Sequence, residues 1–275
     1  MPRTFGDSLV HSSHIDVIIE ADNFEIYEFM TNPAGEVQKK IGELIAENLI
    51  EDGSTLQMDI GDIPNAVLAS LGNHRDLGVH SEMFSDGVLE LVEKNVINNR
   101  FKTTFPGRLV TSFVLGTRRL YDFIDNNPLV HFGSNEWVND PSFIRLQHKM
   151  VAINSAIEID LTGHVVSDSI GGRFYSGFGG QIDFIRGSAI ADDGMGKPII
   201  AIPSINKNTG ESKISAFIKQ GSGVVTTRAH VHYVVTEYGI AQLWGKSVRQ
   251  RAHPLINIAH PQHRKQLDKD VFQRL

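Results

Sequence analysis

The 275-residue sequence contains no cysteine. Disulfides, thiolate metal sites and a cysteine nucleophile are therefore all excluded, and the composition suits a reducing compartment. No apolar run approaches the roughly 18 residues that a membrane-spanning helix needs. Residues 1–5 hold no apolar signal core, and no Arg-rich amphipathic transit segment follows them. We expect a cytoplasmic protein, or a mitochondrial one if a longer N-terminus carries a transit peptide.

The sequence also lacks clustered charge of one sign. The formal net charge is −6, and acidic and basic residues are mixed along the chain. Because sequence-independent nucleic-acid binding needs clustered Lys and Arg, we expect neither a nucleic-acid nor a membrane partner. An anionic ligand would need basic residues that converge locally.

Several motifs are missing as well. No G-x-G-x-x-G follows a strand-like segment, and no Walker A or H-E-x-x-H pattern occurs. We find no internal repeat and no low-complexity segment. Dinucleotide and P-loop chemistry therefore have no support, and we predict no metal and no permanently bound cofactor.

What is present between residues 34 and 150 is an alternation of helix-like and strand-like segments. Helical spacing marks residues 36–48, 61–71, 87–96, 120–124 and 141–146, and strand patterns mark residues 55–60, 77–83, 108–115 and 130–132. Strands that alternate with helices imply a largely parallel sheet covered on both faces. We therefore predict an α/β fold.

The pattern changes after residue 150. Strands are expected at residues 151–160, 164–167, 199–203, 213–217 and 231–236, and helices near residues 182–190, 239–244, 248–258 and 262–275. These strands predict an antiparallel portion added to the mostly parallel sheet. Residues 15–20 also read as a strand, which must join a sheet formed by another part of the protein because a lone strand cannot bury its faces.

Five carboxylates are candidates for chemistry: Glu82, Asp86, Glu158, Asp160 and Glu237. Glu158 and Asp160 share one strand face, which we interpret as a solvated face rather than a catalytic pair. Glu237 follows an apolar strand, where ligand binding and helix capping are equally good explanations. Glu82 is less easily dismissed, because residues 78–87 provide no obvious charge partner for it.

Two glycine-containing stretches, residues 57–61 and 176–180, are candidates to face Glu82. Residues 57–61 join a strand to a helix, an order that leaves backbone N–H groups pointing above the strand end. Glycine lets a backbone approach a ligand closely, although tight turns also explain these glycines. On the glycines alone, a tight turn and a bulge are the better explanation. Our hypothesis is nevertheless that the two stretches hold negative charge that develops when Glu82 attacks an acyl thioester.

Histidines and basic residues give weaker signals. His230 and His232 share a strand face as metal ligands do, but no third ligand is evident. His11, His14, His74 and His80 receive no role. Four basic residues could form a phosphate patch, although each alone is better explained as a surface charge: Arg173, Lys207, Lys213 and Arg228.

Residues 78–87 (GVHSEMFSDG) resemble the active-site motif of the acetyl-CoA hydrolase/transferase family, which includes acetate and 4-hydroxybutyrate CoA-transferases. Residues 56–67, 175–184 and 235–241 are similar to further family segments, so the resemblance covers nearly the whole chain. It implies the α/β CoA-transferase fold, similar to that of ribose-phosphate isomerase. Family chains carry two such domains, which implies that residues 1–33 are the remnant of a first domain and residues 34–275 the C-terminal catalytic domain.

The resemblance also implies site residues. Glu82 takes the place of the glutamate that forms a glutamyl-CoA thioester, and the amides of Met58 and Gly180 take the place of the oxyanion donors. Asn139 matches a residue that steadies the glutamate, and Glu237 an active-site carboxylate. Coenzyme A is then a substrate, and the positions implied to bind it are Gln57, Met58, Asp59, Ile60, Gly61, Ile157, Ser176, Gly180 and Lys207.

The resemblance has two departures. Most of the first domain has no counterpart in this sequence, and the family site lies between domains. Asp59 stands where the family usually has glycine, so its side chain would crowd the thioester and its charge would oppose ionisation of Glu82. We expect a homodimer that moves CoA between an acyl-CoA and a short-chain carboxylate. An acetyl-CoA hydrolase, an inactive CoA-binding fragment and an assembly module remain alternatives, and the acyl group is open.

Overall fold

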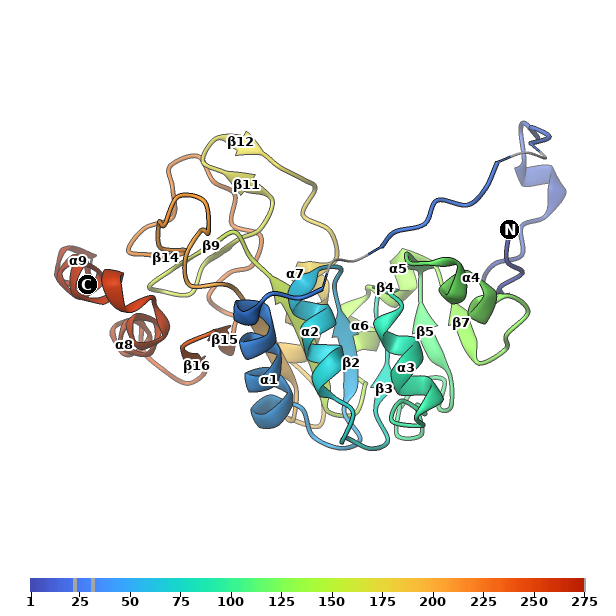
Figure 1. Cartoon of the computed structure of the whole chain (residues 1–275), viewed down its shortest axis with the longest axis horizontal. Coiled ribbons are helices and arrows are strands. Elements are labelled where there is room, and N and C mark those ends of the chain that lie inside the picture. The colour runs from blue at the N-terminus through green and yellow to red at the C-terminus, as the bar shows by residue number, and fades with distance from the viewer. Residues whose placement is uncertain (22–23, 31–32, 275) are drawn as a thin grey trace.

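A six-stranded sheet forms the centre of the computed structural model, which describes residues 1–21, 24–30 and 33–274 (Figure 1). The strand order is β16-β15-β13-β8-β2-β3. Their bounds are β2 (Thr55–Met58), β3 (Gly78–Val79), β8 (Met150–Ser155), β13 (Lys197–Ala201), β15 (Tyr233–Thr236) and β16 (Gly239–Gln242). All neighbouring pairs are parallel except β15–β16, so the predicted α/β sheet with an antiparallel portion is confirmed.

Helices cover both faces of this sheet because alternate strand residues face opposite sides. On β8, Val151 and Ile153 join one core with residues of α1 (Glu36–Leu49) and α2 (Asp62–Ser70). Met150 and Ala152 join a second core with α7 (Gln181–Ala189), α8 (Val248–Ile258) and α9 (Pro261–Arg274). Because β8 is buried on both faces of the sheet, apolar residues occupy both odd- and even-numbered positions along it.

Shorter strands extend the molecule beyond β3, on the right of Figure 1. One parallel sheet has the order β1 (Phe5–Gly6), β7 (Val130–Phe132), β5 (Leu109–Thr111), and β4 (Met83–Phe84) pairs in parallel with β6 (Phe113–Val114). The helices of this region are α3 (Gly87–Glu93), α4 (Arg118–Ile124), α5 (Asn135–Val138) and α6 (Pro141–Ile144). This part places β4 and α5 beside the ends of the main strands.

A third group of strands lies at the upper left of Figure 1, between α7 and the two C-terminal helices. In this group β9 (Glu158–Asp160) pairs with β10 (Val165–Val166) and β14 (Ile214–Ser215), and β11 (Ser169–Ile170) pairs with β12 (Arg173–Phe174). The chain therefore leaves β8, forms β9 to β12 and returns through residues 176–180 to α7, and β14 joins the group after β13.

Two predicted elements are wrong. Residues 15–20 form no strand, and Val17, Ile18 and Ile19 are exposed because no described part of the chain pairs with them. The N-terminal segment includes instead a 3₁₀ helix (Ser12–His14), and it projects beyond α4 (Figure 1). Residues 239–244 begin with strand β16 rather than a helix, since β15 offers an open edge for antiparallel pairing. No helix among the described residues is long and apolar enough to cross a membrane.

Candidate active site

A cavity of about 400 Å³ opens where β2 and β8 end, bounded by the loop that precedes α7. In open α/β sheets the carboxyl ends of the strands are the usual place for ligands. Eight of the predicted site residues line this cavity: Gln57, Met58, Asp59, Ile60, Glu82, Ile157, Ser176 and Gly180. Residues from four separate segments of the sequence therefore meet at one place.

Hydrogen bonds to the backbone of Glu82 fix its position, and its side chain lines the cavity. Its carbonyl oxygen accepts hydrogen bonds from the Ser112 and Phe113 amides at 2.9 and 3.1 Å, and from the Thr111 hydroxyl at 3.2 Å. The side chain is half-buried. Among the described residues, none donates a hydrogen bond to its carboxyl group and none forms an ion pair with it.

Gly180 and Asn139 lie next to the carboxyl group of Glu82. A Cβ atom placed on Gly180 would clash with the Glu82 Oε2 atom and lie 2.7 Å from Asn139 Nδ2. Asn139 follows α5, and its buried Oδ1 atom has no hydrogen-bond partner in the described structure. Only a glycine at position 180 leaves room for the glutamate and the asparagine amide together.

Two helices begin at or directly after residues that line the cavity. Gly180 is the N-cap of α7 and Gly61 the N-cap of α2, and no side chain caps either helix. Gly61 has φ of 142°, a conformation that favours glycine. Uncapped N–H groups at a helix start attract negative charge.

Met58 does not present a free amide. Its N–H donates to Ser81 Oγ at 3.3 Å, and the same hydroxyl donates to the Met58 carbonyl at 3.1 Å. The Gly180 N–H, by contrast, has no acceptor among the described residues. The two predicted oxyanion donors are therefore unequal: the Gly180 amide is available, and the Met58 amide is engaged beside the glutamate.

Two further carboxylates affect the electrostatics. Burial raises the pKa of Asp183, and repulsion by Glu82 and Asp140 raises it further while Arg186 lowers it. Desolvation raises the pKa of Asp59, opposed by a hydrogen bond from the Ile60 amide at 2.8 Å. Asp59 keeps an exposed surface although protein atoms surround its carboxyl group, so the effect of burial is moderated by solvent. Repulsion by Glu82 is not among the causes of its raised pKa.

Two amide side chains that sequence reasoning missed, Asn154 and Gln181, line the cavity beside the predicted Gln57. The side chains of Gln57 and Asn154 are buried and bonded to each other, with Asn154 Nδ2 2.9 Å from Gln57 Oε1. Gln181 accepts from the Ser167 hydroxyl at 2.8 Å and donates to the Ser155 carbonyl at 2.8 Å. An asparagine inside the apolar strand pattern of residues 150–155 was the available signal for this network.

Four predicted site residues do not line the cavity: Gly61, Asn139, Lys207 and Glu237. Glu237 lies between β15 and β16 and accepts hydrogen bonds from the Ser204 amide at 3.0 Å and the Ser204 hydroxyl at 2.5 Å. Lys207 is exposed. Neither is brought to the carboxyl group of Glu82, so their roles stay predictions.

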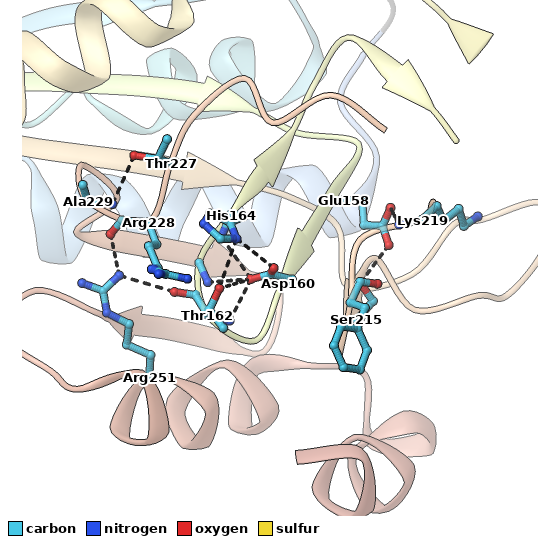
Figure 2. Close-up of polar contacts among 12 residues, drawn as sticks. Glu158, Asp160, Thr162, His164, Ser215, Lys219, Thr227, Arg228, Ala229 and Arg251 are labelled. Atoms are coloured by element: carbon cyan, nitrogen blue, oxygen red, sulfur yellow. Dashed lines mark hydrogen bonds and ion pairs between the residues drawn. The ribbon is translucent and has the colours of Figure 1, made fainter. Parts of the chain in front are cut away.

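The prediction of a solvated face at Glu158 and Asp160 is wrong. Their exposed fractions are 7% and 1%, and both side chains accept hydrogen bonds within the third strand group (Figure 2). Buried carboxylates need donors, and short loops supply them in this group. His232 stacks on Trp244 with ring centroids 4.1 Å apart, and no group of acidic residues and histidines suited to a metal occurs in the described residues.

The fold and the position of the cavity define an α/β protein of the CoA-transferase type. The structure superposes on 4-hydroxybutyrate CoA-transferase from Porphyromonas gingivalis with a TM-score of 0.87 and 40% identity, covering 100% of this chain and 64% of that one. It superposes on RipA from Yersinia pestis with a TM-score of 0.91 and 35% identity, covering 99% of this chain and 61% of that one.

Sequence similarity leads to the family itself. The chain is 58% identical to a succinyl-CoA:acetate/propanoyl-CoA:succinate CoA transferase from Fasciola hepatica. The alignment covers all of this chain and 57% of that protein. The chain is 51% identical over its whole length to 63% of a 4-hydroxybutyrate coenzyme A transferase from Clostridium kluyveri. Residues 116–271 match the acetyl-CoA hydrolase/transferase C-terminal domain. The chain belongs to the acetyl-CoA hydrolase/transferase family, and it spans about six tenths of the length of these relatives.

Proposed function

We propose that this chain carries the catalytic half of a CoA-transferase, which moves CoA between an acyl-CoA and a short-chain carboxylic acid. The observation that supports this most is the carboxyl group of Glu82: it faces a cavity, accepts no hydrogen bond from the described residues and adjoins Gly180 and Asn139. A nucleophile needs free lone pairs and nearby donors for the charge that develops on its target.

The reaction would proceed through covalent exchange. The ionised Glu82 attacks the acyl-CoA carbonyl carbon, and the C–S bond breaks to give an acyl-glutamyl anhydride and CoA thiolate. The thiolate then attacks the glutamyl carbonyl, which gives a glutamyl-CoA thioester and releases the first carboxylate. A second carboxylate attacks the thioester, and the same two steps run in reverse. Because a thiolate leaves readily, no strong general acid is required.

The carbonyl oxygen of each tetrahedral intermediate would accept hydrogen bonds from Gly180 and its neighbours. The Gly180 N–H has no other acceptor among the described residues, and Asn139 Nδ2 lies on the same side of the glutamate. One such donor typically contributes about 3 kcal/mol to catalysis. The Met58 amide can serve only if the Ser81 hydroxyl releases it.

CoA would enter along the cavity wall formed by residues 57–60, Ile157 and Ser176. Curated relatives are named for acetate, succinate, propanoyl and 4-hydroxybutyrate chemistry, and we propose that this chain takes carboxylic acids of that class. Lys207, Gly61 and Glu237 are proposed from the family resemblance alone.

We also propose that residues 1–33 pack on a further domain, and that the active protein is a homodimer. Val17, Ile18 and Ile19 are 74–82% exposed, and such a row of apolar side chains normally has a partner. The segment is anchored at both sides: β1 pairs with β7, and the Tyr27 carbonyl accepts from the Tyr121 hydroxyl at 2.8 Å.

Borohydride trapping tests the covalent step. The 275-residue chain and a version extended at its N-terminus to the length of its relatives are each treated with acetyl-CoA and then with borohydride. We expect reduction of the thioester at Glu82, found by peptide mass, and exchange of labelled acetate into acetyl-CoA. CoA binding without trapping or exchange would contradict the proposal, and turnover independent of added carboxylate would indicate a hydrolase.

A further inference from the structure

His80 lies two residues before Glu82 and contacts the helix that precedes Asn139 and the helix that Gly180 caps. Its side chain is fully buried. Its ring centroid is 5.7 Å from that of Trp137 on α5 and 6.3 Å from that of Phe184 on α7. Its backbone N–H donates to the Leu56 carbonyl on β2 at 3.1 Å. One residue therefore contacts the strand and both helices that surround the cavity.

The polar contact of this ring is with the residue next to Asn139. His80 Nε2 is 2.9 Å from the carbonyl oxygen of Val138. Val138 is the last residue of α5, and the final carbonyls of a helix have no partner within the helix. The Val138 carbonyl belongs to the peptide bond that leads into Asn139. A donor at this point fixes the plane of that peptide and hence the direction of the asparagine side chain.

The surroundings select a neutral imidazole with hydrogen on Nε2. Since a carbonyl only accepts, Nε2 must donate, and Nδ1 is buried without a partner in the described structure. A second proton on Nδ1 would be buried without an acceptor. Burial is the main cause that lowers the pKa of His80 to about 3, and the hydrogen bond to Val138 opposes it. The donor thus stays in place over the range in which enzymes work.

We infer that His80 is a positioning residue: its Nε2–H holds the Val138–Asn139 peptide so that the Asn139 amide points at the carboxyl group of Glu82. This inference rests on the proposed function, because it concerns the same glutamate. His80 touches no substrate. It acts through Asn139, whose amide must hold its place within a fraction of an ångström for the intermediates to be stabilised.

The test compares substitutions that keep or remove the donor. His80→Gln places an amide N–H near the position of Nε2, His80→Asn is too short to do so, and His80→Phe keeps the ring shape only. We expect kcat for CoA exchange to fall about 10- to 100-fold in H80F and H80N, with KM for acetyl-CoA within about 3-fold of wild type. H80Q should retain kcat within about 5-fold.

A double-substitution cycle shows whether His80 acts through Asn139. If it does, H80F in an Asn139→Ala background should cost less than about 2-fold beyond N139A alone. The matched control is His232→Phe, a second buried histidine, at the opposite end of the strands, whose burial lowers its pKa to about 4. H232F should leave kcat per folded molecule unchanged.

The outcomes separate this inference from the proposed function. Wild-type kcat in H80F, additive losses in the cycle, or equal losses in H80Q and H80N would overturn the positioning role alone. Absence of the glutamyl thioester in the wild type would overturn both. If H80F does not fold, the comparison of H80Q with H80N decides the question, because both carry the same amide and differ by one methylene.

Discussion

The cavity around Glu82 and the β9–β10 hairpin around Asp160 each hold a carboxylate among polar groups. The two carboxylates differ in how many hydrogen bonds they accept. Asp160 Oδ1 accepts from the amides of Thr162, Gly163 and His164 at 2.8, 3.0 and 3.1 Å and from the Thr162 hydroxyl at 2.6 Å (Figure 2). Its Oδ2 lies 3.1 Å from His164 Nδ1. The carboxyl group of Glu82 accepts no hydrogen bond from the described residues.

The difference separates carboxylates that hold the fold from one that is free to react. Asp86 belongs with Asp160, because it accepts from the amide and hydroxyl of Thr117 at 2.9 and 2.5 Å and so fixes the start of α4. Glu237 resembles both through its two bonds from Ser204. A hydrogen bond to a charged group is worth about 1.5–3 kcal/mol, so these oxygens are held in place by their own chain.

The largest effect is expected from Glu82→Gln, which tests the free carboxylate directly. Glutamine keeps the size of the side chain but cannot form the anhydride, so exchange of labelled acetate into acetyl-CoA should fall about 10³-fold or more. Glu93→Gln is the control, since Glu93 is exposed and pairs with Arg119 at 2.6 Å. Retention of more than a tenth of the wild-type rate in E82Q would show that Glu82 is not the nucleophile.

Gly180→Ala tests the space beside the glutamate. The added Cβ would displace the carboxyl group and lie 2.7 Å from Asn139 Nδ2, so we expect about a 100-fold loss of kcat. Gly180 has φ of −85°, which alanine adopts readily, so the unfolding free energy should change by less than about 1 kcal/mol.

Gly72→Ala is the matched control for that substitution, because no atom lies within 4 Å of its added Cβ. Both variants are compared by steady-state kinetics and urea unfolding. An active G180A protein would mean that Glu82 and Asn139 tolerate displacement, and that catalysis does not depend on their exact positions.

Asp160→Asn addresses the other side of the comparison. An amide cannot accept as many hydrogen bonds as a carboxylate, and its NH₂ group would meet N–H donors on one side or His164 on the other. We expect the unfolding free energy to fall by about 1–3 kcal/mol while kcat per folded molecule stays unchanged. Asp122→Asn, which removes a side chain 66% exposed and paired with Arg118, should cost less than about 0.5 kcal/mol. A large loss of kcat in D160N with full stability would contradict this division of roles.

Sequence patterns predicted many of the helices and strands, because these depend on residues that are close together in the sequence. Helix spacing found α1 and α8 within about a residue, and apolar runs found β8 and β13, because periodic burial on a covered sheet leaves a periodic sequence. The hypothesis that residues 57–61 and 176–180 face Glu82 came from their glycines and from the strand–turn–helix order at residues 57–61, and residues of both stretches line the cavity with Glu82.

The failures are all nonlocal. Residues 15–20 are rich in Val and Ile like a strand, but pairing needs a neighbour that the described chain does not offer. Residues 239–242 became β16 because β15 had an open edge. Asp160 looked like a surface residue because its donors come from a tight turn whose burial only the folded hairpin creates. The roles of His80 and Asn154 depend on partners 58 and 97 residues away, which no spacing rule reveals.

The smallest effect is expected at Asp59, the exposed carboxylate that lines the cavity beside Glu82. Its raised pKa means that it takes up a proton at a higher pH than a free aspartate does. When ionised it repels the anionic acyl-CoA, so Asp59→Asn should lower KM for acetyl-CoA about 2- to 5-fold at pH 7, as expected for a partly solvated charge. As pH falls, Asp59 takes up its proton earlier than a free aspartate would, so KM of the wild type should approach that of D59N, whose own KM should stay flat. If D59N instead raises KM at pH 7, Asp59 contributes a contact to CoA, and the cavity then holds two carboxylates used for function rather than one.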